Sequence, residues 1–183
     1  MVFHELIQNP ADGTLQVKVI PGVRDFYNLP LEEKKEVSYN SEIQKTEKGI
    51  TVASETLGAG LYEIPRDCFS VEMDISVKHA HELGIALHTD ERMEKGYFLR
   101  MNQRKGTVAW DMWPRSEQGP YQWQIKGDVP YQIETERKLP NADRYHVLII
   151  REDDICIVYI NDQIVLSTRM YDHKGGHAGV YVV

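Results

Sequence analysis

Apolar and polar residues alternate along most of this chain, and this two-residue period constrains its fold more than any other feature. The clearest example is residues 69–77, where every second position is apolar. Successive side chains of a strand point to opposite faces, so the apolar set should face the core of a half-buried strand. Its members are Phe69, Val71, Met73, Ile75 and Val77.

Many other short runs have strand-like patterns, and turn residues separate them. Asn161-Asp162 stands between two strong runs and predicts a tight hairpin, because Asn and Asp tolerate positive φ. Helical pattern is scarce, and only residues 31–36 could form a short helical turn. The remaining runs are 15–20, 50–57, 83–89, 97–102, 107–113, 131–137, 145–150, 155–160, 164–170 and 178–183.

Regularly spaced short strands indicate an antiparallel sandwich or barrel, and we interpret the chain as one all-β, two-sheet β-sandwich. A length of 183 residues is enough for one self-sufficient core. The sequence contains no repeat of 20–50 residues, so a propeller or solenoid is not expected. The predicted organisation is a lead-in segment, 1–40, that packs on a sandwich domain, 41–183.

Charge and composition exclude several partners. The net charge is −7 and the pI about 5.5, whereas nucleic-acid binders usually carry a basic surplus, so no nucleic-acid partner is expected. The sequence has no apolar run of about 18 residues, so no membrane span is expected. Its first residues lack the pattern of a signal peptide, so none is expected either. Two cysteines, Cys68 and Cys156, make no disulfide framework, and one bond or two free thiols are both open. Strand-like sequence at the C-terminus is typical of a domain within a longer protein.

Two titratable patterns are candidate sites with simple structural alternatives. Glu72 and Asp74 share one face of a strand and could act as acid and nucleophile in glycoside hydrolysis. However, the Glu-x-Asp-x-x-Glu pattern of sandwich-fold glycanases is broken at Val77, which favours a solvated face. His79-x-His81 has a chelating spacing but no third ligand. The loop pair His173 and His177 also lacks a third ligand, so we expect no metal and no cofactor.

Aromatic residues gather in the middle of the chain. Trp110 alternates with Val108 and Met112, so it is expected in the core. Flat rings beside polar groups are typical of sugar sites, because a sugar packs its C–H face on a ring and bonds through its hydroxyls. Core filling and interface packing are the alternatives. The candidate carbohydrate-binding residues are Trp113, Tyr121 and Trp123.

Several segments resemble glycoside hydrolase family 32, the invertase, levanase and fructanase group. Residues 4–18, HELIQNPADGTLQVK, are similar to the linker after the catalytic propeller of that family. Residues 145–171 resemble the closing hairpin of its C-terminal sandwich, especially ICIVYIND at 155–162 and VLSTR at 165–169. HTDE at 88–91, GYFLR at 96–100 and GVY at 179–181 extend the likeness. EDD at 152–154 replaces the family's usual Arg-Ser-Ser, which favours a divergent β-fructosidase-like branch.

The resemblance implies a concanavalin-like, lectin-like jelly roll without catalytic residues. In that family a five-bladed propeller, N-terminal to the sandwich, carries the motifs Trp-Met-Asn-Asp-Pro-Asn-Gly, Arg-Asp-Pro and Glu-Cys. None occurs here, and Arg66-Asp67 is followed by Cys68. The resemblance therefore implies a module that packs against such a propeller, favours dimer contacts or touches distal sugar units. The alternatives are a carbohydrate-binding module for fructan or another glycan, and an active glycanase that uses Glu72 and Asp74.

Overall fold

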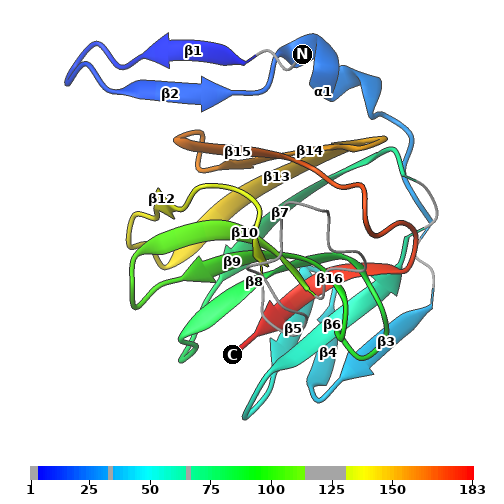
Figure 1. Cartoon of the computed structure of the whole chain (residues 1–183). Coiled ribbons are helices and arrows are strands. Elements are labelled where there is room, and N and C mark those ends of the chain that lie inside the picture. The colour runs from blue at the N-terminus through cyan, green and yellow to red at the C-terminus, as the bar shows by residue number, and fades with distance from the viewer. Residues whose placement is uncertain (1–3, 33–34, 65–66, 114–130) are drawn as a thin grey trace, which may run out of the picture.

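Two antiparallel sheets stacked face to face form the body of the molecule (Figure 1). This computed structural model describes residues 4–32, 35–64, 67–113 and 131–183. The larger sheet contains β3 (Glu36–Tyr39), β6 (Gly58–Glu63), β8 (Glu82–Thr89), β9 (Gly96–Asn102), β10 (Thr107–Trp113), β11 (Tyr131–Gln132), β12 (Arg137–Lys138) and β16 (His177–Val182). The smaller sheet contains β7 (Phe69–Ser76), β13 (Arg144–Glu152), β14 (Ile155–Ile160) and β15 (Ile164–Arg169).

The strand pairings confirm the antiparallel two-sheet sandwich. The larger sheet has the order β11-β10-β9-β8-β16-β6-β3, with β12 also on β10, and the smaller one β15-β14-β13-β7. The main core lies between the sheets and includes Trp110, Tyr97, Tyr145 and Ile149. The alternating apolar positions of β7 all pack on this core, as predicted. Asn161 and Asp162 have φ values of 53° and 54° in the turn between β14 and β15, so the tight hairpin is also confirmed.

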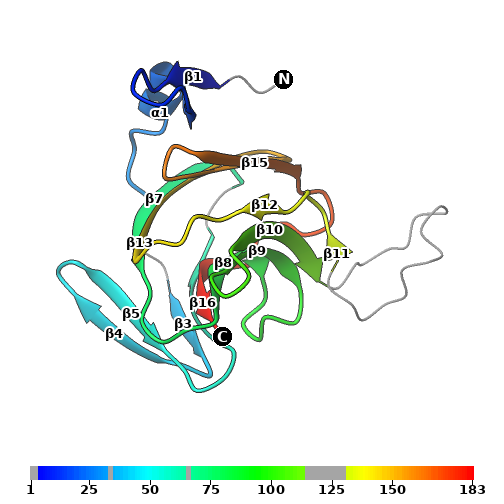
Figure 2. The same cartoon turned by 90° about the vertical axis from the view of Figure 1, so that its left-hand side faces the viewer.

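A separate hairpin extends the smaller layer. Strands β4 (Glu42–Thr46) and β5 (Gly49–Ala53) pair with each other beside β3 and β6 (Figure 2). A Cβ added to Gly60 would lie 3.1 Å from both Ile43 and Val52, so the side chains of the hairpin lie directly on the backbone of β6. The hairpin therefore covers part of the larger sheet that the four-stranded sheet does not reach.

The lead-in lies across the outer surface of the smaller sheet (Figures 1 and 2). It forms a hairpin of β1 (Glu5–Gln8) and β2 (Leu15–Lys18), followed by α1 (Pro21–Phe26). Val17, Val19 and Tyr27 pack on an apolar cluster of β13 and β14. The Tyr27 hydroxyl donates to Glu152 Oε2 at 2.6 Å. Strand β3 pairs with β6, so the larger sheet begins before the boundary at residue 40 expected from sequence.

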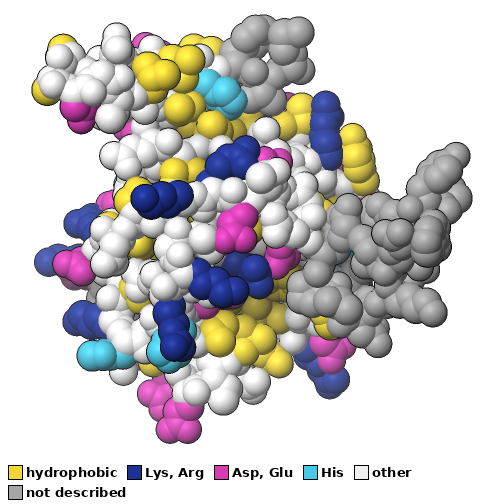
Figure 3. Space-filling model, turned by 60° about the vertical axis from the view of Figure 1, so that its left-hand side comes forward, with side chains coloured by type: hydrophobic (Ala, Val, Ile, Leu, Met, Phe, Trp, Pro, Cys, Tyr) yellow, Lys and Arg dark blue, Asp and Glu magenta, His cyan; other side chains and the backbone are white. Residues whose placement is uncertain are grey.

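Two expectations of secondary structure are wrong. Residues 31, 32 and 35 are not helical and Glu36 begins β3, whereas a proline at its first turn starts the observed helix at Pro21. Residues 131–137 are not one strand, because the run is interrupted between β11 and β12, and each of these short strands pairs separately with β10. Charged side chains of both signs are interspersed on the face drawn in Figure 3, without one continuous basic area. No helix in the described ranges is long and apolar enough to cross a membrane.

Candidate functional site

Strand β10 presents its two tryptophans to opposite sides of the larger sheet. Trp110 is fully buried in the core, as predicted from the alternation. Trp113 lies an odd number of residues later, on the outer face, and is half-buried. Its cross-strand neighbour is Gly96, which has no side chain to cover the indole. The other two predicted sugar-binding residues, Tyr121 and Trp123, lie outside the described residues.

An ion pair between a buried carboxylate and a partly exposed guanidinium lies beside Trp113 on the same face. Asp111 Oδ2 is 2.7 Å from Arg100 Nε, and the side chains are 5% and 40% exposed. The sequence pattern alone does not predict this pair, because the two residues come together only through the register of β9 and β10. One signal was present: Asp is depleted in strands, and Asp111 interrupts the apolar run of β10.

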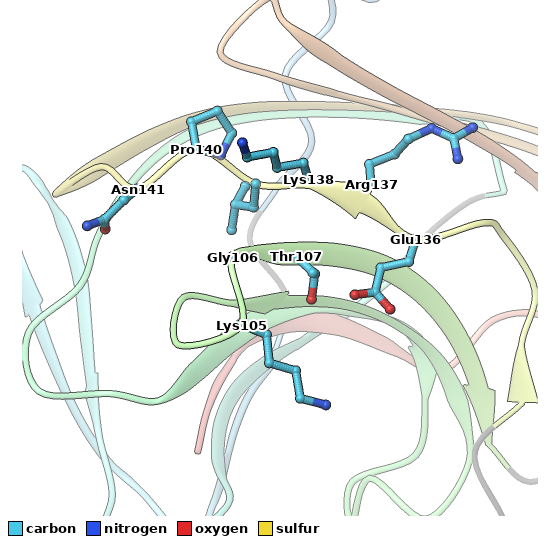
Figure 4. Close-up of a pocket in the computed structure, with 9 residues that line it drawn as sticks. Lys105, Gly106, Thr107, Glu136, Arg137, Lys138, Pro140 and Asn141 are labelled. Atoms are coloured by element: carbon cyan, nitrogen blue, oxygen red, sulfur yellow. The ribbon is translucent and has the colours of Figure 1, made fainter.

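Further polar groups continue this face toward the β9–β10 turn. Asn102 Nδ2 donates to Glu82 Oε2 at 3.3 Å, and Asn102 lies opposite Thr107 in the register. Thr107 and Glu136 line an open depression of about 620 Å³, and Figure 4 shows both polar ends turned to the same side as Lys105. The face therefore offers donors and acceptors along the length of β10.

Carboxylates surround the pair of Asp111 and Arg100. Burial raises the pKa of Asp111, Arg100 opposes that rise, and the negative charges of Glu82 and Glu136 add to it. Glu82 and Glu136 therefore lie close enough to affect the ionisation of Asp111, which is paired with the Arg100 guanidinium. Such a site is poor for an anion and suited to a ligand that both donates and accepts hydrogen bonds.

The predicted acid pair on β7 is held in ion pairs. Glu72 Oε1 contacts Arg24 of the lead-in and lies 3.0 Å from His146 Nε2. Asp74 Oδ2 lies 2.6 Å from Arg144, and Asp74 Oδ1 lies 3.2 Å from His146 Nδ1. The Arg144 hydrogen bond lowers the pKa of Asp74, and His146 adds to this effect, so Asp74 is suited to structural pairing and not to general-acid work. Between this sheet and the lead-in lies a cavity of about 250 Å³.

The histidines and cysteines form no evident reactive centre. Among the described residues, no group of three or more His, Cys, Asp or Glu side chains is placed to hold a metal ion. Cys68 is exposed and Cys156 buried, and both thiols are free. Burial raises the pKa of the Cys156 thiol to about 12, so it remains protonated at neutral pH.

Buried polar groups link the smaller sheet to the connection between β15 and β16. Arg151 is fully buried, and its Nε donates to His88 Nε2 at 3.2 Å. His88 Nδ1 is 3.0 Å from the Gly175 carbonyl, so it carries the proton and donates. The Tyr97 hydroxyl accepts from the backbone N–H of Asp172 at 2.9 Å. This network fixes a neutral histidine beside a buried cation.

Large apolar side chains remain exposed on the lead-in. We call these residues the lead-in apolar surface, and the most exposed are Leu29 at 81% and Phe26 at 74%. Apolar surface concentrated in one short segment is typical of an interaction site. The members are Leu6, Ile7, Leu15, Val23, Phe26, Leu29 and Leu31.

Comparison with solved structures identifies the fold. The carbohydrate-binding module CBM66 from Bacillus subtilis aligns with a TM-score of 0.65 at 18% identity, over 84% of this chain and 91% of that module. Exo-inulinase from Aspergillus awamori aligns with a TM-score of 0.55 at 14% identity, over 98% of this chain and 34% of the enzyme.

Sucrose-6-phosphate hydrolase from Lactobacillus gasseri gives a TM-score of 0.50 at 14% identity, over 98% of this chain and 32% of that protein. The chain thus spans about a third of these two enzymes but most of the binding module. No protein-family profile and no curated protein sequence matches the chain. At these identities the likeness shows a shared β-sandwich fold.

Proposed function

We propose that this chain is the non-catalytic C-terminal β-sandwich of a family 32-like β-fructosidase, whose parent enzyme hydrolyses sucrose or a fructan. Its role is to support an N-terminal five-bladed catalytic propeller. The exo-inulinase likeness supports this proposal, because it extends over 98% of this chain and a minor part of the enzyme. The ion pairs of Glu72 and Asp74 agree with catalysis elsewhere.

The lead-in apolar surface is the observation that carries this function. Phe26 and Leu29 are among the most exposed large apolar side chains of the described residues. Covering both would remove apolar area from water, a gross hydrophobic contribution of about 25 cal/mol per Å² that offsets part of the entropy lost on association. We propose that the propeller of the parent enzyme covers this surface.

The docking proposal is tested with the propeller domain of the parent enzyme, expressed separately and titrated with this chain. The double variant Phe26→Ser/Leu29→Ser should weaken association at least about tenfold, because it removes two apolar anchors. Tyr171→Ser is the matched control, since Tyr171 is 60% exposed outside the lead-in. Binding by light scattering that is equal in wild type and double variant would contradict the docking surface. Hydrolysis of sucrose or inulin by this chain alone would contradict the non-catalytic role.

A second candidate function is carbohydrate binding, and the CBM66 likeness favours it. That comparison covers 91% of the carbohydrate-binding module CBM66, so nearly all of that module has a counterpart in this chain. Titration of this chain with fructo-oligosaccharides in a calorimeter is expected to release heat at millimolar sugar. Absence of heat at that concentration would remove this candidate and leave the supporting role in place.

A further inference from the structure

The outer face of β8, β9 and β10 gathers polar side chains beside the aromatic rings of Trp113 and Phe98. Arg100 and Asp111 form its centre, Trp113 lies at one end, and Thr107 lies at the other. These positions share a side of the sheet, because residues two, four or six apart in a strand point the same way. We call this surface the β10 outer face, and its residues are Glu82, Arg100, Asn102, Thr107, Asp111 and Trp113.

The spacing along β10 fits sugar rings. Trp113 and Asp111 are two residues apart, which is about 7 Å along a strand, so one ring can lie on the indole while its hydroxyls reach the ion pair. From Trp113 to Thr107 the distance is about 20 Å, which is enough for several units. Arg100 is 40% exposed, so part of its donor group faces solvent.

The charges select a neutral ligand. Arg100 forms an ion pair with Asp111 on this face. The negative charges of Glu82 and Glu136 also act on Asp111, because they help to raise its pKa. At the Arg100–Asp111 pair, a phosphate or carboxylate group would meet the repulsion of these acids, whereas Lys105 lies farther along, at the Thr107 end of the face. Sugar hydroxyls both donate and accept, so they can satisfy Arg100 and Asp111 together.

We infer that the β10 outer face binds a neutral glycan, with a sugar ring on Trp113 and adjacent hydroxyls on Arg100 and Asp111. This inference rests on the carbohydrate-binding function proposed above. All six residues lie in the part of the chain that the structure describes, and the polar groups come from three neighbouring strands held in register. Such a rigid sheet surface orients its side chains before the ligand arrives, which lowers the ordering cost of binding.

The test is a calorimetric titration of the full chain with 1-kestose, and then with the matched probes sucrose and sucrose 6-phosphate. Wild type should bind the neutral sugars and bind the phosphate ester at least about tenfold more weakly. Trp113→Ala and Arg100→Ala should each weaken 1-kestose binding at least about tenfold. Tyr171→Ala and Arg144→Ala are matched controls, because both residues are exposed elsewhere. Circular dichroism checks that each variant is folded.

Each outcome has a distinct meaning. Binding that is lost in Trp113→Ala and Arg100→Ala but kept in both controls supports the site. Binding that survives in both site variants overturns this assignment and leaves the carbohydrate-binding function standing. No binding of any neutral sugar by wild type overturns both the function and the site. Equal affinity for sucrose and its phosphate ester overturns the selection for a neutral ligand.

Discussion

Replacing Trp110 by alanine is expected to lower the free energy of unfolding by about 3–5 kcal/mol, the range found when a large aromatic is removed from a core. Trp110 is fully buried and packs in the main core between the two sheets. Its side chain is the largest among the fully buried residues, so the remaining cavity would be correspondingly large. Urea unfolding of wild type and variant, followed by fluorescence and circular dichroism, measures the difference.

Trp113→Ala provides the matched control on the same strand. This side chain is half-buried on the outer face, so its removal should cost less than about 1 kcal/mol. The two variants therefore separate a stability role from a binding role within one strand. Equal losses of stability in the two variants would contradict the opposite orientations of the two tryptophans.

The contrast between these tryptophans shows what alternation can predict. A period of two places Phe69, Met73 and Trp110 on the core side without knowledge of any partner strand, and the structure confirms each placement. The pattern is local and comes from backbone geometry. A second local rule, the tolerance of Asn and Asp for positive φ, predicts the hairpin at Asn161, where a side-chain oxygen also accepts the backbone N–H of His146 at 2.8 Å.

The pairing of strands explains what alternation along one strand could not predict. Arg100 and Asp111 meet across the β9–β10 register, and a register shift of one residue would place them on opposite faces. Gly84 also depends on register: a Cβ there would lie 2.0 Å from the Leu99 carbonyl oxygen and 2.6 Å from the Tyr181 ring. Glu72 and Asp74 were visible as a pair, but their partners Arg24 and Arg144 come from other elements.

The buried pair of Arg151 and His88 should make the fold sensitive to acid. His88 is 2% exposed, and its Nε2 accepts a hydrogen bond from Arg151. Burial lowers the pKa of His88 below its usual value of 6.5, and the charges of Arg151 and His173 lower it further. The Gly175 carbonyl and Asp67 act in the opposite direction but do not reverse the shift.

The direction of the pH dependence follows from this shift. Above pH 6.5 the histidine is neutral in both the folded and the unfolded chain, so it adds no pH dependence. As the pH falls below 6.5, the unfolded chain binds the proton before the native state does. The free energy of unfolding should therefore fall by up to about 1.4 kcal/mol per pH unit, until the lowered native pKa is reached.

Urea unfolding at a series of pH values between 7 and 4 tests this expectation in wild type and His88→Gln. The substitution removes the titrating ring, so the variant should lose less stability per pH unit below pH 6.5, even if its stability at neutral pH is lower. His81→Gln is the control for an exposed histidine and should keep the wild-type slope. Identical slopes in wild type and His88→Gln would show that this pair does not cause the acid sensitivity. A steeper loss in wild type would identify the contact between Arg151 and His88 as the point where protonation and tertiary structure are coupled, because the added proton occupies the atom that accepts the Arg151 hydrogen bond.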